Sequence, residues 1–346
     1  MKLSICVPTY NREKNLKNCL QSINIASQGL DSSFRVEICI SDNFSTDGTE
    51  GVVRDANLTL PVKYCKNNSN LGIPRNFLNV VDMAEGEFAW LIGDDDLLLP
   101  DAIFRLYELI DSHPGVDFFY VNSFHLNTEY LDLYPAPFDT ANLPARMIPF
   151  SSWSYPAEMK FLDLIDPKIS FDFLGGMFLS VFRKSLWDKN VDSLDHDAIF
   201  DNRTFSHFDN TFPHVKIFAN AFSNSRAYFN DKPMNVCLTG AREWSPMYPF
   251  VHSVRLVEAL DEYRKNGLPF FKYIYCKNYA LNNFVFDFVK MFLARETSGY
   301  RYVDPPRLIA GYCLYPNFYL SFIYFLARLA RKFLNPLRVF IIGLFS

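Results

Sequence analysis

The sequence of 346 residues lacks the glycine-rich turns on which two large classes of nucleotide-dependent protein rely. Residues 7–11 (VPTYN), at the end of the first apolar run, contain no glycine, which argues against a dinucleotide-dependent oxidoreductase. No GxxxxGK(S/T) sequence occurs, which argues against a P-loop NTPase. The opening segment also lacks the glycines and basic residues typical of sugar nucleotidyltransferases. That class stays open as an alternative because it shares an α/β sheet and an acidic metal site.

The chain also lacks cysteine and histidine spacings that bind metals or form disulfides. Its seven cysteines include no CxxC pair, and an odd number without pairing spacings is typical of reduced thiols in the cytoplasm. The six histidines show no metal-ligand spacing, so we expect them to be structural, with His214 and His252 as candidate phosphate contacts. No signal peptide is evident, and the net charge of −4 argues against binding to nucleic acid.

Short apolar runs alternate with helical patterns over the first 120 residues. The runs at 3–8, 36–41, 62–65, 88–92 and 118–121 predict strands, and apolar side chains at helical spacing predict helices between them. Such alternation predicts an α/β fold with a doubly wound, mostly parallel sheet and helices on both faces. Residues 127–170 have no clear period, and the segments at 210–222, 252–265 and 270–295 predict an α-rich C-terminal portion.

Polar side chains follow three of the predicted strands at the points where those strands end. Residues 8–12 (PTYNR) follow the first strand, Asp42 follows the second, and residues 94–96 (DDD) follow the fourth. Ligands of open α/β sheets bind where the carboxyl ends of strands meet. Three adjacent carboxylates repel one another unless a cation is present, and oxygen ligands suit Mn²⁺ or Mg²⁺. The alternative is a solvated acidic turn that caps the following helix.

Four motifs, in order, resemble those of family 2 glycosyltransferases with the GT-A fold. They are residues 3–12 (LSICVPTYNR), 41–49 (SDNFSTDGT), 70–76 (NLGIPRN) and 91–100 (LIGDDDLLLP). The resemblance covers about the first 120 residues, and the GDDD form is most similar to the abequosyltransferase-type branch. It implies an enzyme that transfers a sugar from a nucleoside-diphosphate sugar to a hydroxyl group, with inversion at the anomeric carbon and with Mn²⁺ or Mg²⁺ as cofactor.

The same resemblance implies roles for individual residues of the donor site. Thr9, Tyr10 and Arg12 would line the nucleotide pocket, and Pro8 would shape its turn. Asp42 would accept a hydrogen bond from a pyrimidine base.

The resemblance also places residues around the donor diphosphate. Arg75 would pair with a donor phosphate, unless it pairs with a neighbouring acid instead. Asp95 would bind the metal directly, with Asp96 beside it and Asp94 as a further contact of the donor. This chain departs from the family in having Gly93 where a carboxylate is usual.

Two aspartates compete for the role of general base. An inverting transfer needs a group that accepts the proton of the attacking hydroxyl. The family places a carboxylate just before a helix in its second half, and Asp209, in the sequence HFDNT, holds that position here, although the usual Glu-Asp pair is missing. Asp172, which precedes Gly175 and Gly176, is the competitor, and either aspartate could instead cap a helix or turn. Arg242, two residues before a tryptophan, is a candidate for binding donor phosphate, unless it is a surface residue without a role.

The C-terminal segment combines basic and apolar residues. Residues 301–346 carry six basic side chains and one acid, whereas the whole chain is net negative. The apolar run at 312–327 has 16 residues, too few for a confident membrane span. A helix here would carry two opposite faces, one polar (Asn317, Ser321, Tyr324, Arg328, Arg331, Asn335) and one apolar (Phe318, Phe322, Phe325, Leu329, Phe333). This pattern predicts an amphipathic helix at an anionic membrane surface, and packing against the core is the alternative.

These observations predict three regions. Residues 1–122 would form the half that binds the nucleotide sugar, residues 123–265 the half that binds the acceptor, and residues 266–346 an aromatic, basic region that associates with the inner face of the cell membrane. The predicted acceptor is a glycan or a polyprenyl-diphosphate-linked saccharide, in the biosynthesis of an O-antigen-like or capsule-like surface polysaccharide. The alternatives are a sugar nucleotidyltransferase and a non-catalytic sugar-binding scaffold.

Overall fold

The computed structural model describes residues 2–240 and 243–344, with side chains as far as Arg331. The chain forms two compact units. The first runs to Glu243 and includes residues 262–268, and the second comprises Trp244–Asp261 and the residues from Pro269 onward. The strand Phe118–Asn127 runs through residue 122, where the sequence analysis places the boundary between the first two regions. The division into three functional regions stays a prediction.

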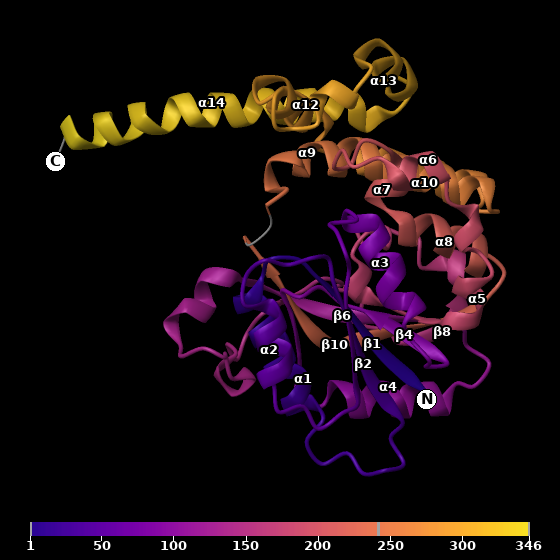
Figure 1. The fold of residues 1–346 in the computed structure, drawn as a ribbon. Coiled ribbons are helices and arrows are strands. Elements are labelled where there is room, and N and C mark those ends of the chain that lie inside the picture. Colours follow the sequence, from indigo (N-terminus) through magenta and orange to yellow (C-terminus); the bar gives the residue numbers. More distant parts are fainter. Residues whose placement is uncertain (1, 241–242, 345–346) are drawn as a thin grey trace. The chain divides into compact units, whose positions relative to one another are not determined.

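One sheet forms the centre of the first unit (Figure 1). Its order is β3-β2-β1-β4-β9-β6-β10-β5, with β7 beside β6 and β8 beside β10. The pairs among β1 to β4 and the pair β6–β10 are parallel, whereas β9 lies antiparallel between β4 and β6. The strands are β1 (Leu3–Thr9), β2 (Val36–Asp42), β3 (Val62–Lys66), β4 (Phe88–Leu91), β5 (Asp96–Leu98), β6 (Phe118–Asn127), β7 (Ile148–Pro149), β8 (Ala157–Lys160), β9 (Ser180–Arg183) and β10 (Arg226–Thr239).

Helices cover both faces of this sheet, so the predicted α/β architecture is confirmed. The longest of them, α1, buries Leu16, Cys19, Leu20 and Ile23, the side chains whose spacing predicts it. The helices of the first unit are α1 (Glu13–Ala26), α2 (Thr49–Asp55), α3 (Ile73–Asp82), α4 (Ala102–Ser112), α5 (Lys184–Asp188), α6 (His196–Phe200), α7 (Phe208–Thr211) and α8 (Pro213–Phe222).

Aromatic side chains build much of the core of the first unit. Phe118 of β6 packs edge-to-face against Phe161, Phe218 and Phe222, with ring centroids 4.9 to 5.3 Å apart. Phe182 of β9 joins the same group through Phe218. Such pairs contribute about 0.5–1.5 kcal/mol beyond the burial of their area, so the aromatic residues stabilise the region where β9 enters the sheet.

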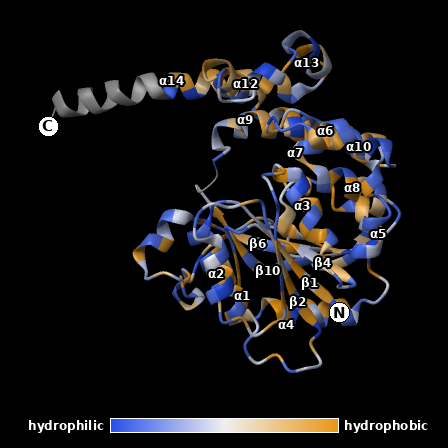
Figure 2. Ribbon diagram, in the orientation of Figure 1, coloured by the Kyte–Doolittle hydropathy of each residue, from blue (hydrophilic) through white to orange (hydrophobic). Residues whose placement is uncertain are grey.

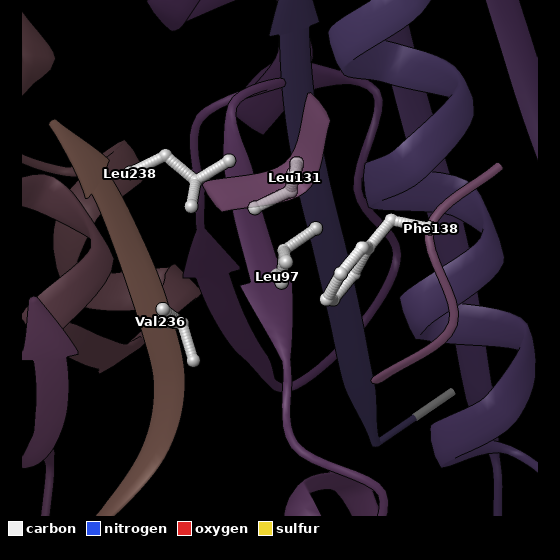
Figure 3. Packing of buried hydrophobic residues seen from close by; sticks show 5 residues of the cluster. All are labelled: Leu97, Leu131, Phe138, Val236 and Leu238. Atoms are coloured by element: carbon white, nitrogen blue, oxygen red, sulfur yellow. The ribbon is translucent and has the colours of Figure 1, made fainter. Parts of the chain in front are cut away.

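A second apolar cluster fixes the short strand β5 (Figure 3). Leu97 of β5 lies among Leu131, Phe138, Val236 and Leu238, and all five side chains are buried. Because Leu97 directly follows the acidic residues 94–96, this cluster sets where the acidic turn lies.

The second unit is helical, which confirms the predicted α-rich C-terminal portion. Helix α11 is anchored to α10 by Lys277, which donates hydrogen bonds to Asp261 at 2.8 Å and to the Tyr273 hydroxyl at 2.7 Å. The helices are α9 (Tyr248–Phe250), α10 (Leu256–Lys265, whose last residues belong to the first unit), α11 (Phe270–Ala280), α12 (Phe284–Leu293), α13 (Pro305–Tyr312) and α14 (Pro316–Leu344).

Candidate active site at the carboxyl ends of three strands

Strands β1, β2 and β4 end at the same edge of the sheet. Thr9, the last residue of β1, is the register partner of Asp42, the last residue of β2. The turn after β4 lies on the other side of β1, and the Thr9 hydroxyl donates a hydrogen bond to Asp94 at 2.8 Å. Pro8 is buried within β1, and Tyr10 lies just beyond it with a partly exposed ring. The structure therefore brings together the three clusters that the sequence places at strand ends.

Arg12 is the cation of this site. It stands just before α1, and its Nη1 atom lies 3.1 Å from Asp94 Oδ1 and 3.4 Å from Asp95 Oδ2. Both aspartates are more than nine-tenths buried. The two carboxylates thus converge on one guanidinium group, and Arg12 supplies the positive charge that three adjacent acids require.

Asp96 is directed differently from its two neighbours. It begins β5, where its backbone pairs with Cys237 of β10, and its Oδ2 accepts a hydrogen bond from the Gly93 amide at 2.7 Å. A side chain at Gly93 would begin 2.5 Å from Asp95 Oδ1 and 3.1 Å from Asp96 Oδ2. The glycine therefore leaves room for the carboxylates in their observed positions, and Asp96 closes the acidic turn.

Burial and charge together perturb the ionisation of this turn. Burial and the neighbouring Asp95 raise the pKa of Asp94 to about 7, against the opposing influence of Arg12 and of the hydrogen bond from Thr9. Burial alone would lower the pKa of Arg12, but Asp94 and Asp95 raise it above its ordinary value. A carboxyl group with a perturbed pKa and a specific charged partner is characteristic of functional sites.

The acidic turn has the donor atoms for a divalent cation that is shared with a substrate. Among the described residues no group of three or more His, Cys, Asp or Glu side chains could hold a metal ion by itself. Mg²⁺, however, is often bound in proteins through one or two carboxylates together with the phosphates of a substrate. Asp94 and Asp95 present oxygens to one point, now taken by Arg12 Nη1, and so they fit such an ion. Ligation by Asp95 or Asp96 stays a prediction.

Asp42 is fixed by two hydrogen bonds on the other side of β1. It is fully buried, and its carboxylate accepts from the Ser45 amide at 2.7 Å and from the Tyr64 hydroxyl at 2.8 Å. Burial and the hydrogen bond to Asp42 raise the pKa of Tyr64 well above its ordinary value. The sequence analysis misses Tyr64, whose only signal is its position within the third predicted strand.

Asn76 of α3 connects the ends of β1 and β2. Its side-chain amide donates to the backbone oxygens of Thr9 at 3.3 Å and Ser41 at 3.1 Å, and its oxygen accepts from the Ser41 hydroxyl at 2.7 Å. This buried amide holds the two strand ends in register with each other. The sequence analysis includes Asn76 in a motif but assigns it no role.

Arg75 faces away from this amide, toward the segment before α7. Its Nε donates to the Leu71 oxygen at 2.6 Å, its Nη2 to Asn202 at 3.3 Å, and its guanidinium lies 4.6 Å from the centre of the Phe200 ring. These contacts join α3 to residues 200–202. No acidic side chain is among the partners described for Arg75, and its role toward the donor stays a prediction.

The two candidate bases have different surroundings. Asp209 of α7, which packs against α3, accepts hydrogen bonds from Lys216 and from the Asp195 amide, both at 2.6 Å. Asp172 accepts from the amides of Leu174 at 3.3 Å and Gly176 at 2.8 Å and from Ser170, and burial raises its pKa. Asp172 thus organises a turn, which is the alternative role described above for it.

The turn after Asp172 has an unusual backbone. Phe173 and Leu174 have positive φ angles of 49° and 69°. The Phe173 oxygen accepts a hydrogen bond from the Tyr263 hydroxyl at 3.1 Å, and the Gly175 oxygen accepts one from His214 Nε2 at 3.0 Å. Burial lowers the pKa of His214 to about 4, so this imidazole is neutral at ordinary pH. Its observed partner is a backbone oxygen, as expected for a structural histidine.

Two further residues, Arg242 and His252, are predicted from the sequence to contact phosphate. Arg242 lies outside the described residues. Its neighbour Glu243 is described, and its negative charge helps to raise the pKa of Arg12. His252 lies 3.3 Å from Asp287 within the second unit, in an interaction with a carboxylate.

Comparison with known proteins gives a consistent result. The sequence model of glycosyl transferase family 2 matches residues 4–184. Abequosyltransferase RfbV of Salmonella typhimurium is 31% identical over 250 residues, which cover 68% of this chain and 66% of that protein. GalNAc(5)-diNAcBac-PP-undecaprenol beta-1,3-glucosyltransferase of Campylobacter jejuni is 36% identical over 110 residues, which cover 31% of this chain and 34% of that protein. The matched regions thus span about two thirds and one third of these relatives.

Solved structures share the fold. The crystal structure of Staphylococcus aureus TarS residues 1–349 has a TM-score of 0.57 at 22% identity, and the match covers 84% of this chain and 74% of that one. A likeness at this identity supports the GT-A fold alone. The family model matches more than half of the chain, and the abequosyltransferase is similar in sequence over most of it. The chain therefore belongs to glycosyl transferase family 2 and is a glycosyltransferase.

Proposed function

We propose that this enzyme moves a sugar from a nucleoside-diphosphate donor to a hydroxyl of a polyprenyl-diphosphate-linked saccharide, with inversion and with the help of Mn²⁺ or Mg²⁺. One observation carries the proposal. Asp94 and Asp95 converge on Arg12 at the strand edge where Asp42 also lies, so an acidic turn lies beside a buried hydrogen-bond acceptor. A pyrimidine nucleoside diphosphate would fit both features. Its base has N–H donors for Asp42, and its diphosphate would share a divalent cation with the acidic turn.

In the donor half of the site, different residues would bind the base and the diphosphate. Asp42, oriented by Tyr64 and Ser45, would accept a hydrogen bond from the base, and Thr9 and Tyr10 would flank it. Asp94 and Asp95 would hold the cation, which offsets the negative charge that develops on the leaving nucleoside diphosphate. Arg12 would then turn from the carboxylates toward the diphosphate, where its guanidinium supplies further positive charge.

Asp209 is the better candidate for the base. In a single displacement the acceptor oxygen forms a bond to the anomeric carbon, the bond to the diphosphate breaks, and the hydroxyl proton passes to a carboxylate. Lys216 and the Asp195 amide both donate to the same oxygen of Asp209, Oδ2, and α7 packs beside α3 of the donor half. Asp172, by contrast, is engaged by the backbone of its own turn.

The proposed acceptor is supported by the second unit and by one relative. The printed name of the C. jejuni protein describes a glucosyltransferase that acts on an undecaprenol-linked saccharide. In the second unit, α14 packs Ser321 inward, whereas Phe322, Ile323 and Leu326 are exposed. Polar Asn317 is likewise bonded to α11.

This arrangement is unusual for a helix exposed to water. Burying such apolar side chains is worth about 1.5–3 kcal/mol each, so their exposure favours a lipid surface. Arg307, Arg328 and Arg331 are exposed as well, which suits anionic headgroups. Figure 2 shows apolar and polar residues interleaved along the described part of α14. Phe333 and Asn335, assigned above to its two faces, lie outside the described side chains. We propose that this region rests on the inner face of the cell membrane.

No single helix among the described residues has the length and apolar character to cross a membrane, and α13 with residues 316–331, bent by 111°, meets those criteria only as a pair.

Nucleotide binding tests the proposal. A panel of nucleoside diphosphates is titrated by calorimetry with and without Mn²⁺ into the wild-type protein, Asp95→Ala and Asp101→Ala. Asp101 is an exposed aspartate near the same turn and serves as a matched control. We expect one nucleotide to bind in an Mn²⁺-dependent manner to the wild type and to Asp101→Ala, and not to Asp95→Ala. If no nucleoside diphosphate bound to the folded wild-type protein, with or without Mn²⁺, the proposal would be refuted.

Turnover separates the remaining alternatives. Transfer from the matching nucleotide sugar to a lipid-linked saccharide, with inversion seen in the NMR coupling of the new linkage, is the expected outcome. Formation of a nucleotide sugar from a nucleoside triphosphate and a sugar 1-phosphate would identify a nucleotidyltransferase instead. Binding without turnover of any donor would identify a sugar-binding scaffold.

A further inference from the structure

The second unit contains an apolar pocket to which the reaction described above gives no use. It has a volume of about 420 Å³, within the range of roughly 300–1,000 Å³ that is usual for small-molecule sites. One wall is α11, and the other is formed by the end of α13 and the start of α14. Its lining includes Phe271, Ile274, Tyr275, Gly311, Leu314 and Tyr315.

The walls of the pocket are held by specific contacts. At its base, Asn278 of α11 accepts hydrogen bonds from the backbone and side-chain amides of Asn317, both at 2.9 Å. Lys277, one position before Asn278, anchors the other side of α11 to Asp261. Two helices that are joined in this way keep the pocket open, so it is a preformed feature of the second unit.

The rim of the pocket is apolar and exposed. Phe271 is 85% exposed and Leu314 is 86% exposed, and both line the pocket. The apolar surface continues onto α14 through Tyr319 and Ile323. Exposed apolar side chains that gather at a pocket are characteristic of a binding site for a hydrophobic ligand.

One positive charge stands beside this pocket. Arg307 is exposed and lies four residues before Gly311 in α13, so the two residues share one face of that helix. The combination of an apolar hole and a neighbouring guanidinium matches an amphiphile with a hydrocarbon chain and an anionic head.

We propose that this pocket binds an isoprenoid segment of the polyprenyl-diphosphate acceptor, with Arg307 next to the diphosphate. The inference rests on the function proposed above and adds a site that holds the lipid part of the acceptor. Two interactions would stabilise the bound lipid. Its hydrocarbon chain would contact Phe271, Tyr275 and Leu314, and its diphosphate would pair with the guanidinium of Arg307.

Gly311 allows the pocket to be filled without disturbing the fold. Gly311 lines the pocket, and a Cβ built there meets no other atom within 4 Å, so Gly311→Leu adds a side chain at the pocket wall without a clash. Ala310→Leu adds a leucine of the same size to the next position of α13, which is exposed and does not line the pocket, and is the matched control. Leu314→Ser is a second variant that removes exposed wall and leaves the buried core intact.

The probe is geranylgeranyl diphosphate in detergent micelles, and binding to the full-length protein is followed by intrinsic fluorescence. We expect the dissociation constant to rise about tenfold or more in Gly311→Leu and in Leu314→Ser, a loss of about 1.4 kcal/mol or more, and to stay unchanged in Ala310→Leu. Arg307→Gln should weaken the binding of geranylgeranyl diphosphate but leave the binding of geranylgeraniol unchanged. Equal binding of palmitoyl phosphate would identify a general lipid site and overturn the isoprenoid assignment.

A steady-state measurement separates this inference from the proposed function. With a lipid-linked acceptor, Gly311→Leu should raise KM about tenfold, whereas with the same saccharide on a short water-soluble aglycone it should match the wild type. An unchanged KM for the lipid-linked acceptor would overturn the pocket assignment and leave the glycosyltransferase proposal standing. Absence of transfer by the wild type to either acceptor would count against the proposed function itself.

Discussion

Replacing Arg12 with glutamine should make the empty enzyme bind divalent cations more tightly. In the wild type the guanidinium lies at 3.1 and 3.4 Å from the carboxylates of Asp94 and Asp95, so a cation must displace it. At an effective dielectric constant of about 20, a charge pair at this separation has a Coulomb energy of roughly 5 kcal/mol. Desolvation of the buried groups offsets most of that energy. The remaining coupling of about 1–3 kcal/mol corresponds to roughly 5- to 150-fold in the cation dissociation constant.

The same substitution should destabilise the protein when no cation is present. Removing one partner of a buried pair costs about 3–5 kcal/mol when the other charge remains. At low pH the cost should be smaller, because Asp94, whose pKa is about 7 even with Arg12 in place, takes up a proton. We therefore expect Arg12→Gln to melt well below the wild type at pH 8, and Mn²⁺ to recover most of that difference.

The assay is a titration with Mn²⁺ followed by electron paramagnetic resonance, without nucleotide, for the wild type, Arg12→Gln and Arg54→Gln. Arg54 also pairs with an aspartate but lies exposed on α2, so it is the matched control and should bind Mn²⁺ as the wild type does. If Arg12→Gln bound Mn²⁺ no more tightly than the wild type, Arg12 would not compete with a cation. The proposed displacement of Arg12 by a metal ion would then be wrong.

Three further predictions concern the base, the buried histidine and the membrane face. Asp209→Asn should lower kcat by about 10²–10⁴-fold with unchanged donor binding in calorimetry, whereas Asp172→Asn should mainly lower the free energy of unfolding, by about 1–3 kcal/mol. Because burial lowers the pKa of His214 to about 4, the unfolded chain takes up this proton first as the pH falls. Denaturant titrations should therefore show a loss of about 1.4 kcal/mol per pH unit between pH 6.5 and 4, with full stability above that window, and His214→Gln should lack this component. Replacing Phe322 and Ile323 with serine should reduce sedimentation with anionic vesicles about tenfold or more, since burial of each such side chain is worth about 1.5–3 kcal/mol.

Each of these has a result that would contradict it. Full activity of Asp209→Asn would remove it as the base, and equal loss in Asp172→Asn without destabilisation would reassign that role. Parallel pH profiles for the wild type and His214→Gln would mean that the imidazole is not held neutral. Unchanged sedimentation of the serine variant would favour a role for α14 in contacts with protein.

The convergence of the acidic turn with Thr9 and Asp42 is predictable from sequence because it follows from topology. Consecutive parallel strands end at one edge of a sheet, so residues at strand ends become neighbours whatever their other surroundings. The direction of each side chain within the turn does not follow in this way. Asp96 turns from its neighbours because β5 pairs with Cys237, some 140 residues later in the chain, and such long-range pairing leaves no local signal.

The ion pairs of Arg12 with Asp94 and Asp95 also cannot be predicted from local sequence patterns. The sequence places Arg12 in the donor loop, but its approach to Asp94 depends on the positive φ of Asn11 and on where α1 begins. Periodicity also separates two faces of α14 without saying which one packs inward. The structure buries Ser321 of the polar face, and of the apolar face it packs Phe318 against Phe284 while Phe322 stays exposed, so neither face is wholly turned inward.

Gly93 connects a departure from the family pattern with the electrostatics of the site. A carboxylate at that position would begin 2.5 Å from Asp95 Oδ1 and would have to shift the Asp95 carboxylate, whose Oδ2 approaches Arg12. It would also add a negative charge to a buried turn in which the pKa of Asp94 already stands near 7. With glycine, two carboxylates converge on a single cation, and Asp96 is free to close the turn through the Gly93 amide. The loss of the usual acid at 93 is therefore consistent with a working cation site, in which Asp94 and Asp95 together supply what the family motif obtains from another spacing.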